Sequence, residues 1–128
     1  ACFEEDVFQS EMARRAIGYV RKAYGDELEF LWKKFPDNAV FRRKDTKKWY
    51  GALLTVQRCR LGLEGQGTAE ILDLRVQPEE LAALIDCKRY FPAYHMNKKH
   101  WVTVSLDGAV PFDEVADRID ASWRLAKK

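Results

Sequence analysis

Helical periodicity at both ends of the chain, with short alternating segments between them, restricts the fold more than any other feature of the sequence. Apolar residues between Phe3 and Tyr24 recur every three to five positions, and no proline interrupts them. A second apolar stripe follows Pro111, and proline is favourable in the first turn of a helix. The chain has 128 residues, which is a typical length for a domain with one hydrophobic core. We therefore expect a single domain over residues 1–128, in which residues 1–25 form an N-terminal helical segment.

Short segments in the middle of the chain have the pattern of β-strands. Trp49–Arg60 is rich in the residue types that strands prefer, and Ala69–Val76 and Trp101–Leu106 alternate as half-buried strands do. Shorter strands are predicted at 28–32 and Ala39–Arg43, which are separated by a proline-containing turn. A polar hairpin loop is expected to follow the second of these short strands.

Turn residues and one further helix complete the expected architecture. Glycines after residue 60 indicate a flexible connection, and Pro78 is well placed to begin a helix that ends near Cys87. Residues 90–99 show no clear period and are expected to be irregular. The sequence therefore predicts the α+β class, with an antiparallel β-sheet flanked by an N-terminal helix, a middle helix and a C-terminal helix.

Charge is segregated along the chain, although the formal net charge is only +2. Residues 33–60 carry +7 and residues 88–104 carry +4, whereas residues 61–87 carry −5. No apolar stretch approaches the roughly 18 residues that a membrane-spanning helix needs. The acidic start of the chain also differs from the basic and then apolar start of a signal peptide. We expect no association with a membrane.

The three cysteines, Cys2, Cys59 and Cys87, are an odd number and show no CxxC spacing. This usage fits a reducing compartment, in which cysteine behaves as a small buried hydrophobic residue. Cys59 is expected to lie within the strand that begins at Trp49. The sequence therefore predicts a cytoplasmic protein without a disulfide framework.

The residues that could carry catalysis or hold a metal form no recognised motif. His95 and His100 are five positions apart, which does not match a helical metal pair, and no CxxC or HExxH motif accompanies them. Cys59 or Cys87 could pair with a histidine, and Ser105 could pair with His100, but none lies in a nucleophile motif. We expect no catalytic residue, no metal site and no cofactor, so the chain is not predicted to be an enzyme.

The most specific segment runs Pro92-Ala93-Tyr94-His95-Met96-Asn97-Lys98-Lys99-His100-Trp101-Val102-Thr103-Val104, followed by Leu106-Asp107-Gly108. It closely resembles the signature of the bacterial MmcQ/YjbR-like family. Three stretches support the resemblance in chain order: Phe41-Arg42-Arg43 with Lys48-Trp49-Tyr50, Leu72-Asp73-Leu74-Arg75-Val76-Gln77-Pro78-Glu79, and Ser122-Trp123-Arg124-Leu125. The similar region spans about residues 32–126, and Trp123 stands where the family often has Tyr.

The resemblance implies an α+β fold and a DNA-binding function. Such proteins share a secretion-chaperone-like, CyaY-like α+β architecture, in which helices flank an antiparallel sheet. The family is described as DNA-binding through a proposed double-wing arrangement, and it is otherwise uncharacterised. The fold expected from the resemblance agrees with the fold expected from the residue pattern.

Basic residues in two parts of the chain suit contacts with the phosphates of DNA. Lys and Arg that project from hairpins neutralise phosphates and release counterions, which makes binding sensitive to salt. The expected contacts are Arg42, Arg43, Lys47, Lys48, Lys98, Lys99 and His100, and the expected loop-shaping residues are His95, Asn97 and Trp101. Trp49, Tyr50, Tyr94 and Trp101 could stack on exposed bases if they face outward. The hypothesis requires residues 42–48 and 98–100 to share one face.

A second hypothesis is a protein-interaction module, and a third is that the cations are simply solvated while the aromatic residues form the core. A sheet with an exposed face or edge can dock a peptide or a helix. The acidic stretch 61–87 could pair electrostatically with a protein partner or with a second copy. This second hypothesis predicts an exposed apolar patch of roughly several hundred Å². The sequence leaves the oligomeric state, the protein partner and any preference for a DNA sequence open.

Overall fold

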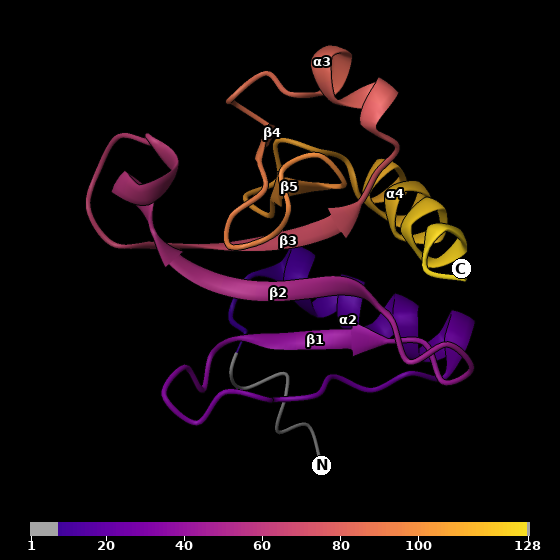
Figure 1. Ribbon diagram of the computed structural model, residues 1–128. Helices are drawn as coiled ribbons and strands as arrows, with labels where there is room; N and C mark the ends of the chain where they lie inside the picture. The colour runs from indigo at the N-terminus through magenta and orange to yellow at the C-terminus, as the bar shows by residue number, and fades with distance from the viewer. Residues whose placement is uncertain (1–7, 128) are drawn as a thin grey trace.

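The computed structural model describes residues 8–127, and it is an α+β fold (Figure 1). Its helices are α2 (Glu11–Tyr24), α3 (Leu81–Leu84) and α4 (Phe112–Leu125), with short 3-10 helices η1 (Arg58–Leu61) and η2 (Pro78–Glu80). Its strands are β1 (Ala39–Arg42), β2 (Trp49–Gln57), β3 (Thr68–Arg75), β4 (Tyr90–Pro92) and β5 (Trp101–Ser105). The predicted fold class is confirmed.

The five strands form one antiparallel sheet in the order β1-β2-β3-β5-β4. Arg42 at the end of β1 pairs with Trp49 at the start of β2, and Arg75 at the end of β3 pairs with Trp101 at the start of β5. Strand β4 is antiparallel to β5. The β1–β2 loop and the β4–β5 loop therefore leave the sheet at the same end.

Helices α2 and α4 pack against one face of the sheet. Helix α2 begins at Ser10, whose side chain accepts the N–H of Ala13, and ends at Gly25 with φ 69°. The predicted end of this helix at Gly25 is confirmed. The predicted start of this helix was wrong, because Phe8 lies before it. Ser10 is the N-cap, so the helix begins at Glu11, and Phe8 is buried outside the helix. The part of this prediction between residues 1 and 7 lies outside the described residues.

Helix α4 is attached to the middle of the sheet through one buried serine. The Ser122 hydroxyl donates to the carbonyl of Tyr50 at 2.6 Å and accepts the N–H of Arg75 at 2.8 Å. Val115 and Ile119, on the expected apolar stripe, are buried on the same side of the helix. The C-terminal helix is thus confirmed, and it adds a polar contact that its apolar pattern did not predict.

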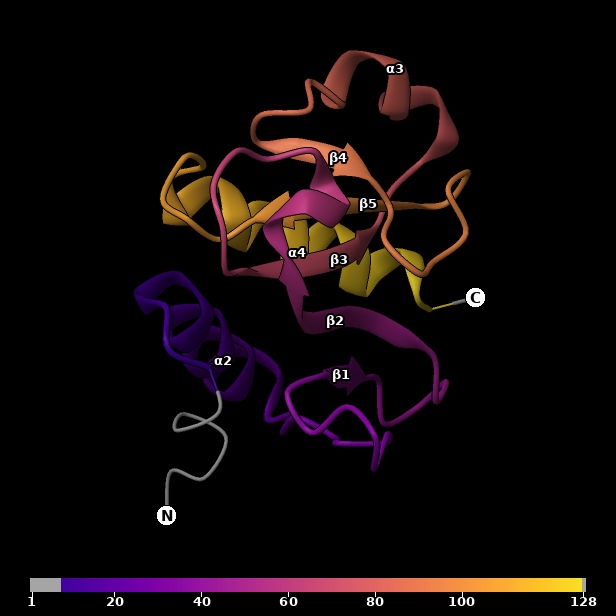
Figure 2. The same cartoon turned by 90° about the vertical axis from the view of Figure 1, so that its left-hand side faces the viewer.

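The opposite face of the sheet, termed the loop face, is covered by loops instead of long helices. Its buried residues are Val40, Ala52, Leu54, Val56 and Ile71. Trp49 of β2 packs against them, and three other segments supply further side chains: the loop before β1 supplies Trp32, η1 supplies Leu61, and the β4–β5 loop supplies Tyr94. In Figure 2, η1 lies in front of the strands and α4 lies behind them.

Several predicted elements differ in extent from those in the structure. The strand expected at 28–32 is reduced to one isolated bridge, between Glu29 and Val40. Strand β2 ends at Gln57, and Cys59 lies in η1, not in a strand. Strand β2 ends there because the chain turns into η1, in which the N–H groups of Gly62 and Leu63 donate to the carbonyls of Cys59 and Arg58.

The middle helix is also shorter than predicted, and one strand was missed. The expected helix from Pro78 to Cys87 is divided into η2 and α3, which ends at Leu84. The Asp86 carboxylate accepts the backbone N–H groups of Lys88, Arg89 and Tyr90, and this turn replaces the last helical residues. Strand β4 follows directly, in a segment expected to be irregular.

Two cysteines can be placed, and neither is buried. Cys59 and Cys87 are free and exposed, so the expectation of buried cysteines was wrong for both. Exposure follows from their positions, since Cys59 lies in η1 and Cys87 lies in the turn before β4 with φ 57°. Cys2 lies outside the described residues. Within residues 8–127, no helix is long and apolar enough to cross a membrane.

Candidate nucleic-acid interface

Two lysine pairs project from loops at one end of the sheet. Lys47 and Lys48 belong to the β1–β2 loop, Lys98 and Lys99 belong to the β4–β5 loop, and all four are exposed. We term this region, with these four lysines, the basic end. Strands β2 and β5 are separated only by β3, so their first residues lie about 10 Å apart.

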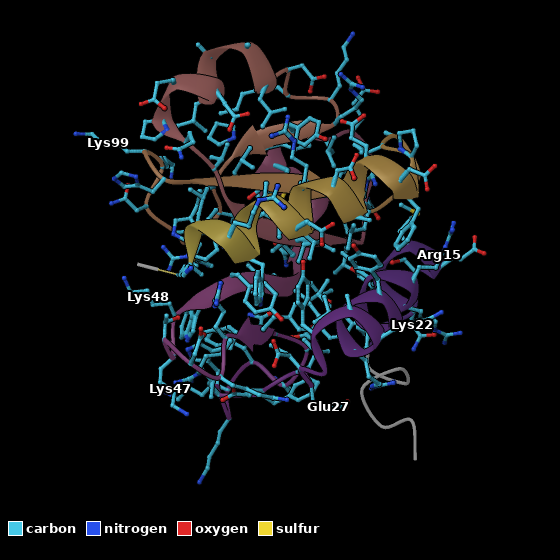
Figure 3. The ribbon with its side chains drawn as sticks, turned by 90° about the vertical axis from the view of Figure 1, so that its right-hand side faces the viewer. Arg15, Lys22, Glu27, Lys47, Lys48 and Lys99 are labelled. Carbon is cyan, nitrogen blue, oxygen red and sulfur yellow. The ribbon has the colours of Figure 1, made fainter. Side chains whose placement is uncertain are left out.

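Figure 3 shows Lys47, Lys48 and Lys99 on the same side of the molecule, whereas Arg15 and Lys22 lie on the other side. Lysines from the two basic segments, 42–48 and 98–100, therefore lie on one side of the molecule, as the phosphate-binding hypothesis requires. This placement results from the strand order and register, and it was not predictable from the charges alone.

The β1–β2 loop has a fixed conformation. The N–H of Arg43 donates to the carbonyl of Lys48 at 2.9 Å, and the N–H of Lys47 donates to the carbonyl of Arg43 at 3.1 Å. Lys47 has φ 64°, in the left-handed region. The hydroxyl of Thr46 donates to the carbonyl of Ala126 at 2.8 Å, so the loop is held against the end of α4.

Arg43 is part of the fold and is removed from the expected phosphate contacts. Its side chain is only 5% exposed, and it donates two hydrogen bonds to Asp45, at 2.7 and 2.8 Å. It also donates to the carbonyl of Trp123 at 2.8 Å and lies 3.7 Å from the centre of that ring. This pairing lowers the pKa of Asp45 to about 2. Arg42 lies 3.2 Å from Glu29, so its charge is partly compensated.

Asn97 shapes the β4–β5 loop, as its sequence context suggested. Its side-chain oxygen accepts the N–H of Lys99 at 2.8 Å, and its carbonyl accepts the N–H of His100 at 3.2 Å. The carbonyl of His100 in turn accepts the N–H of Val76 at 2.9 Å. His95 is exposed, with φ 63°. These contacts fix the backbone that carries Lys98 and Lys99.

A buried carboxyl group lies beneath this loop. The N–H of Tyr94 donates to the hydroxyl of Thr103 at 2.9 Å, and that hydroxyl donates to Asp73. The Asp73 side chain is fully buried, and within residues 8–127 its second oxygen has no hydrogen-bond partner. Burial raises the pKa of Asp73 to about 7, and the charge of Lys98 opposes this shift. This group was not singled out from the sequence, because the half-buried alternation of β3 does not show which loop covers the face that carries Asp73.

The aromatic residues expected to stack on bases divide into two groups. Tyr50 is fully buried, and its hydroxyl donates to Asp26 at 2.5 Å. Trp101 is buried under the guanidinium of Arg75, which lies 4.7 Å from the ring centre. Neither ring can stack on a base, so this expectation was wrong for both. Trp49 and Tyr94 are half-buried and stay candidates.

The nucleophile pairs considered from the sequence are either far apart or not joined by a hydrogen bond in the described part of the chain. His100 precedes β5 and Ser105 ends it, so they lie about 16 Å apart along an extended strand. Ser105 is also buried. Cys87 and His95 line the same hollow of the surface, but no hydrogen bond joins them in the described part of the chain. Within residues 8–127, no three His, Cys, Asp or Glu side chains gather as a metal site would require.

Comparison with known proteins identifies the family. The sequence model of the YjbR family matches residues 21–125. The chain belongs to the YjbR family. An uncharacterized Bacillus subtilis protein, YyaQ, is 34% identical over 123 residues, which cover 96% of this chain and 97% of YyaQ. The uncharacterized YjbR of Escherichia coli K12 is 46% identical over 35 residues, which cover 27% of this chain and 30% of that protein.

Solved structures of YjbR-like chains have the same fold. A crystal structure of a Pseudomonas syringae protein has 38% sequence identity and a TM-score of 0.86, covering 89% of this chain and 97% of that one. A Deinococcus radiodurans protein has 25% identity and a TM-score of 0.71, covering 94% of this chain and 83% of that one. The resemblance found in the signature segment is confirmed, and it extends along most of the YjbR fold.

Proposed function

We propose that this YjbR-family domain is a cytoplasmic nucleic-acid-binding protein that contacts phosphates through its basic end and acts without a cofactor or catalytic step. The observation that carries the proposal is the strand register, which brings two lysine-bearing loops to the same end of the sheet. Lysines on such loops contact phosphates and position a protein on nucleic acid without reading its sequence.

The local charge at the basic end favours an anionic ligand. The carboxylate of Asp45, in the same loop as Lys47 and Lys48, is paired with Arg43. The lysines themselves are exposed, and both loops are held by backbone hydrogen bonds. Binding therefore requires little ordering of the protein backbone, and its strength is set by the number of phosphates neutralised.

The proposal is tested by the salt dependence of binding to a fluorescent DNA duplex. Four phosphate contacts predict that the logarithm of the association constant falls with the logarithm of salt concentration with a slope of about −4. Replacing one lysine pair, Lys98→Ala with Lys99→Ala, reduces this slope to about −2. Replacing Lys47 and Lys48 together has the same effect.

Lys22→Ala is the matched control, since this lysine is exposed on the other side of the molecule (Figure 3). Its slope and affinity are expected to equal those of the unchanged protein. The proposal is rejected if no duplex or single strand binds at about 50 mM salt, at which phosphate contacts are strong. It is also rejected if the lysine pairs have no more effect than Lys22.

A protein-interaction module, related in fold to secretion chaperones, is the second candidate. The observation in its favour is that Leu31 and Phe35, in the loop before β1, are 42% and 56% exposed. Large apolar side chains exposed at the surface can contribute to a patch at which a partner binds. A protein that shows no affinity for nucleic acid, and whose partner is lost with Leu31→Ser, would favour this candidate.

A further inference from the structure

A groove crosses the loop face beside the basic end. Three hollows, of about 410, 330 and 320 Å³, adjoin one another and are all lined by His95. Phe35 lines two of them, and Arg60 and Tyr94 also line two. We term this set of hollows the aromatic groove. It begins at Trp32 and continues past His95 to Arg60.

Aromatic side chains from two different loops form the walls of this groove. Trp32 and Phe35 come from the loop before β1, and Tyr94 and His95 come from the β4–β5 loop. Phe35 has more than half of its surface exposed, which is unusual for a ring of this size. Trp32 is held edge-to-face by Trp49, with ring centres 5.7 Å apart, so the frame of the groove is fixed.

The lining of the aromatic groove is positively charged, which favours an anionic ligand. Arg60 and Lys98 line it, and no Asp or Glu from residues 8–127 lines any of its three hollows. Lys33 and Lys34 are exposed in the short segment between the two aromatic residues before β1. A ligand that matches this surface carries flat apolar groups together with negative charges.

We propose that the aromatic groove binds unpaired bases of a single nucleic-acid strand. Bases stack on exposed aromatic rings with little regard to sequence, and neighbouring cations follow the sugar-phosphate backbone. Lys98 lines the groove and also belongs to the basic end, so one strand can contact both regions. This inference rests on the proposed phosphate contacts and adds that the preferred ligand is single-stranded.

The test compares two fluorescent strands of equal length and equal phosphate count, a thymidine oligomer and an abasic oligomer. Both carry the charges that the basic end recognises, but only the first has bases. Stacking of even one base on the groove makes the thymidine strand bind at least about five-fold more tightly. Phe35→Ala is expected to bring the affinity of the thymidine strand close to that of the abasic strand. The affinity of the abasic strand itself is expected to stay unchanged.

Leu31→Ala is the matched control, because Leu31 is exposed in the same loop and does not line the groove. The Leu31→Ala variant is expected to bind the thymidine strand more tightly than the abasic strand by the same factor as the unchanged protein. Both substitutions are at exposed positions, and circular dichroism checks that the two variants remain folded. Arg60→Gln is a second variant, and it is expected to weaken both strands equally because it removes a phosphate contact.

The possible outcomes separate this inference from the proposed function. Equal affinity for the two strands, with salt-sensitive binding retained, overturns the base-binding groove and leaves the phosphate contacts in place. Failure of both strands to bind overturns the base-binding groove, and it overturns the phosphate contacts as well only if the DNA duplex also fails to bind. If a glutamate-rich peptide that contains tryptophan binds instead, and Phe35→Ala abolishes its binding, the groove is a site for an acidic peptide and not for bases.

Discussion

The buried carboxyl group of Asp73 makes a quantitative prediction about stability. Its pKa is about 7 in the folded protein, against an ordinary value of 3.8. Between these values the folded protein holds a proton that the unfolded chain releases, so stability falls as pH rises from about 4 to about 7 and is level above that. One pKa unit corresponds to about 1.4 kcal/mol, so the full effect is about 4 kcal/mol.

Asp73→Asn removes this dependence because the amide stays neutral. The amide oxygen keeps the hydrogen bond from Thr103, while the new NH₂ group takes the place of an oxygen that has no partner in the described structure. That buried donor costs about 1–3 kcal/mol at every pH. The variant is therefore less stable than the unchanged protein at about pH 5, and its relative stability rises by about 3 kcal/mol by about pH 8.

Urea unfolding followed by tryptophan fluorescence, at several pH values between about 5 and about 8, measures this change. Asp45 and Glu27 have lowered pKa values because of Arg43 and Arg21, so their contributions are lost only in more acidic solution. Asp117→Asn, at an exposed position of α4, is the matched control for the loss of a carboxylate. A constant difference in stability between Asp73→Asn and the unchanged protein across this range would refute the reasoning.

Three further substitutions test the packing of the fold. Ser122→Ala leaves the buried N–H of Arg75 without its hydrogen-bond acceptor, and a loss of about 2–3 kcal/mol in urea unfolding is expected. Gly51→Ala would place a methyl group 2.9 Å from the Phe41 ring, so we expect a loss of about 1–3 kcal/mol and a lower melting temperature. In contrast, Gly18→Ala, in helix α2 with nothing within 4 Å of the new methyl, should raise stability by up to about 1 kcal/mol. An unchanged melting temperature in either glycine variant would contradict this account of the packing.

Local chemistry was sufficient to predict the elements whose limits depend on neighbouring residues. Gly25 ends α2 because glycine adopts a positive φ without strain, and this was visible in the sequence. The polar hairpin loop between β1 and β2 was also predicted correctly. The middle helix is an exception, since it was predicted too long although its end is also local: the Asp86 carboxylate bonds to the N–H groups of the next residues, and this turn was not recognised in the sequence.

The environments of single side chains could not be predicted in this way. Arg43 was expected to contact phosphates at the surface, and no environment was predicted for Asp73, yet both charged residues are buried. Arg43 is buried by α4, and Asp73 lies on the face that the β4–β5 loop covers. Burial of this kind depends on contacts between distant segments, which neither periodicity nor residue type reveals. For the same reason, the aromatic groove was missed.

The attachment of the β1–β2 loop to the end of α4 has a consequence for the order of events during synthesis. The hydrogen bonds from Arg43 to Trp123 and from Thr46 to Ala126 each join residues that are 80 positions apart. A ribosome adds about 5–20 residues per second, so these acceptors are made about 4–16 seconds after the loop that needs them. Until then Arg43 has only its neighbour Asp45 as a partner, and the loop that carries Lys47 and Lys48 lacks its support. The basic end is therefore among the last parts of the nascent chain to reach its final form.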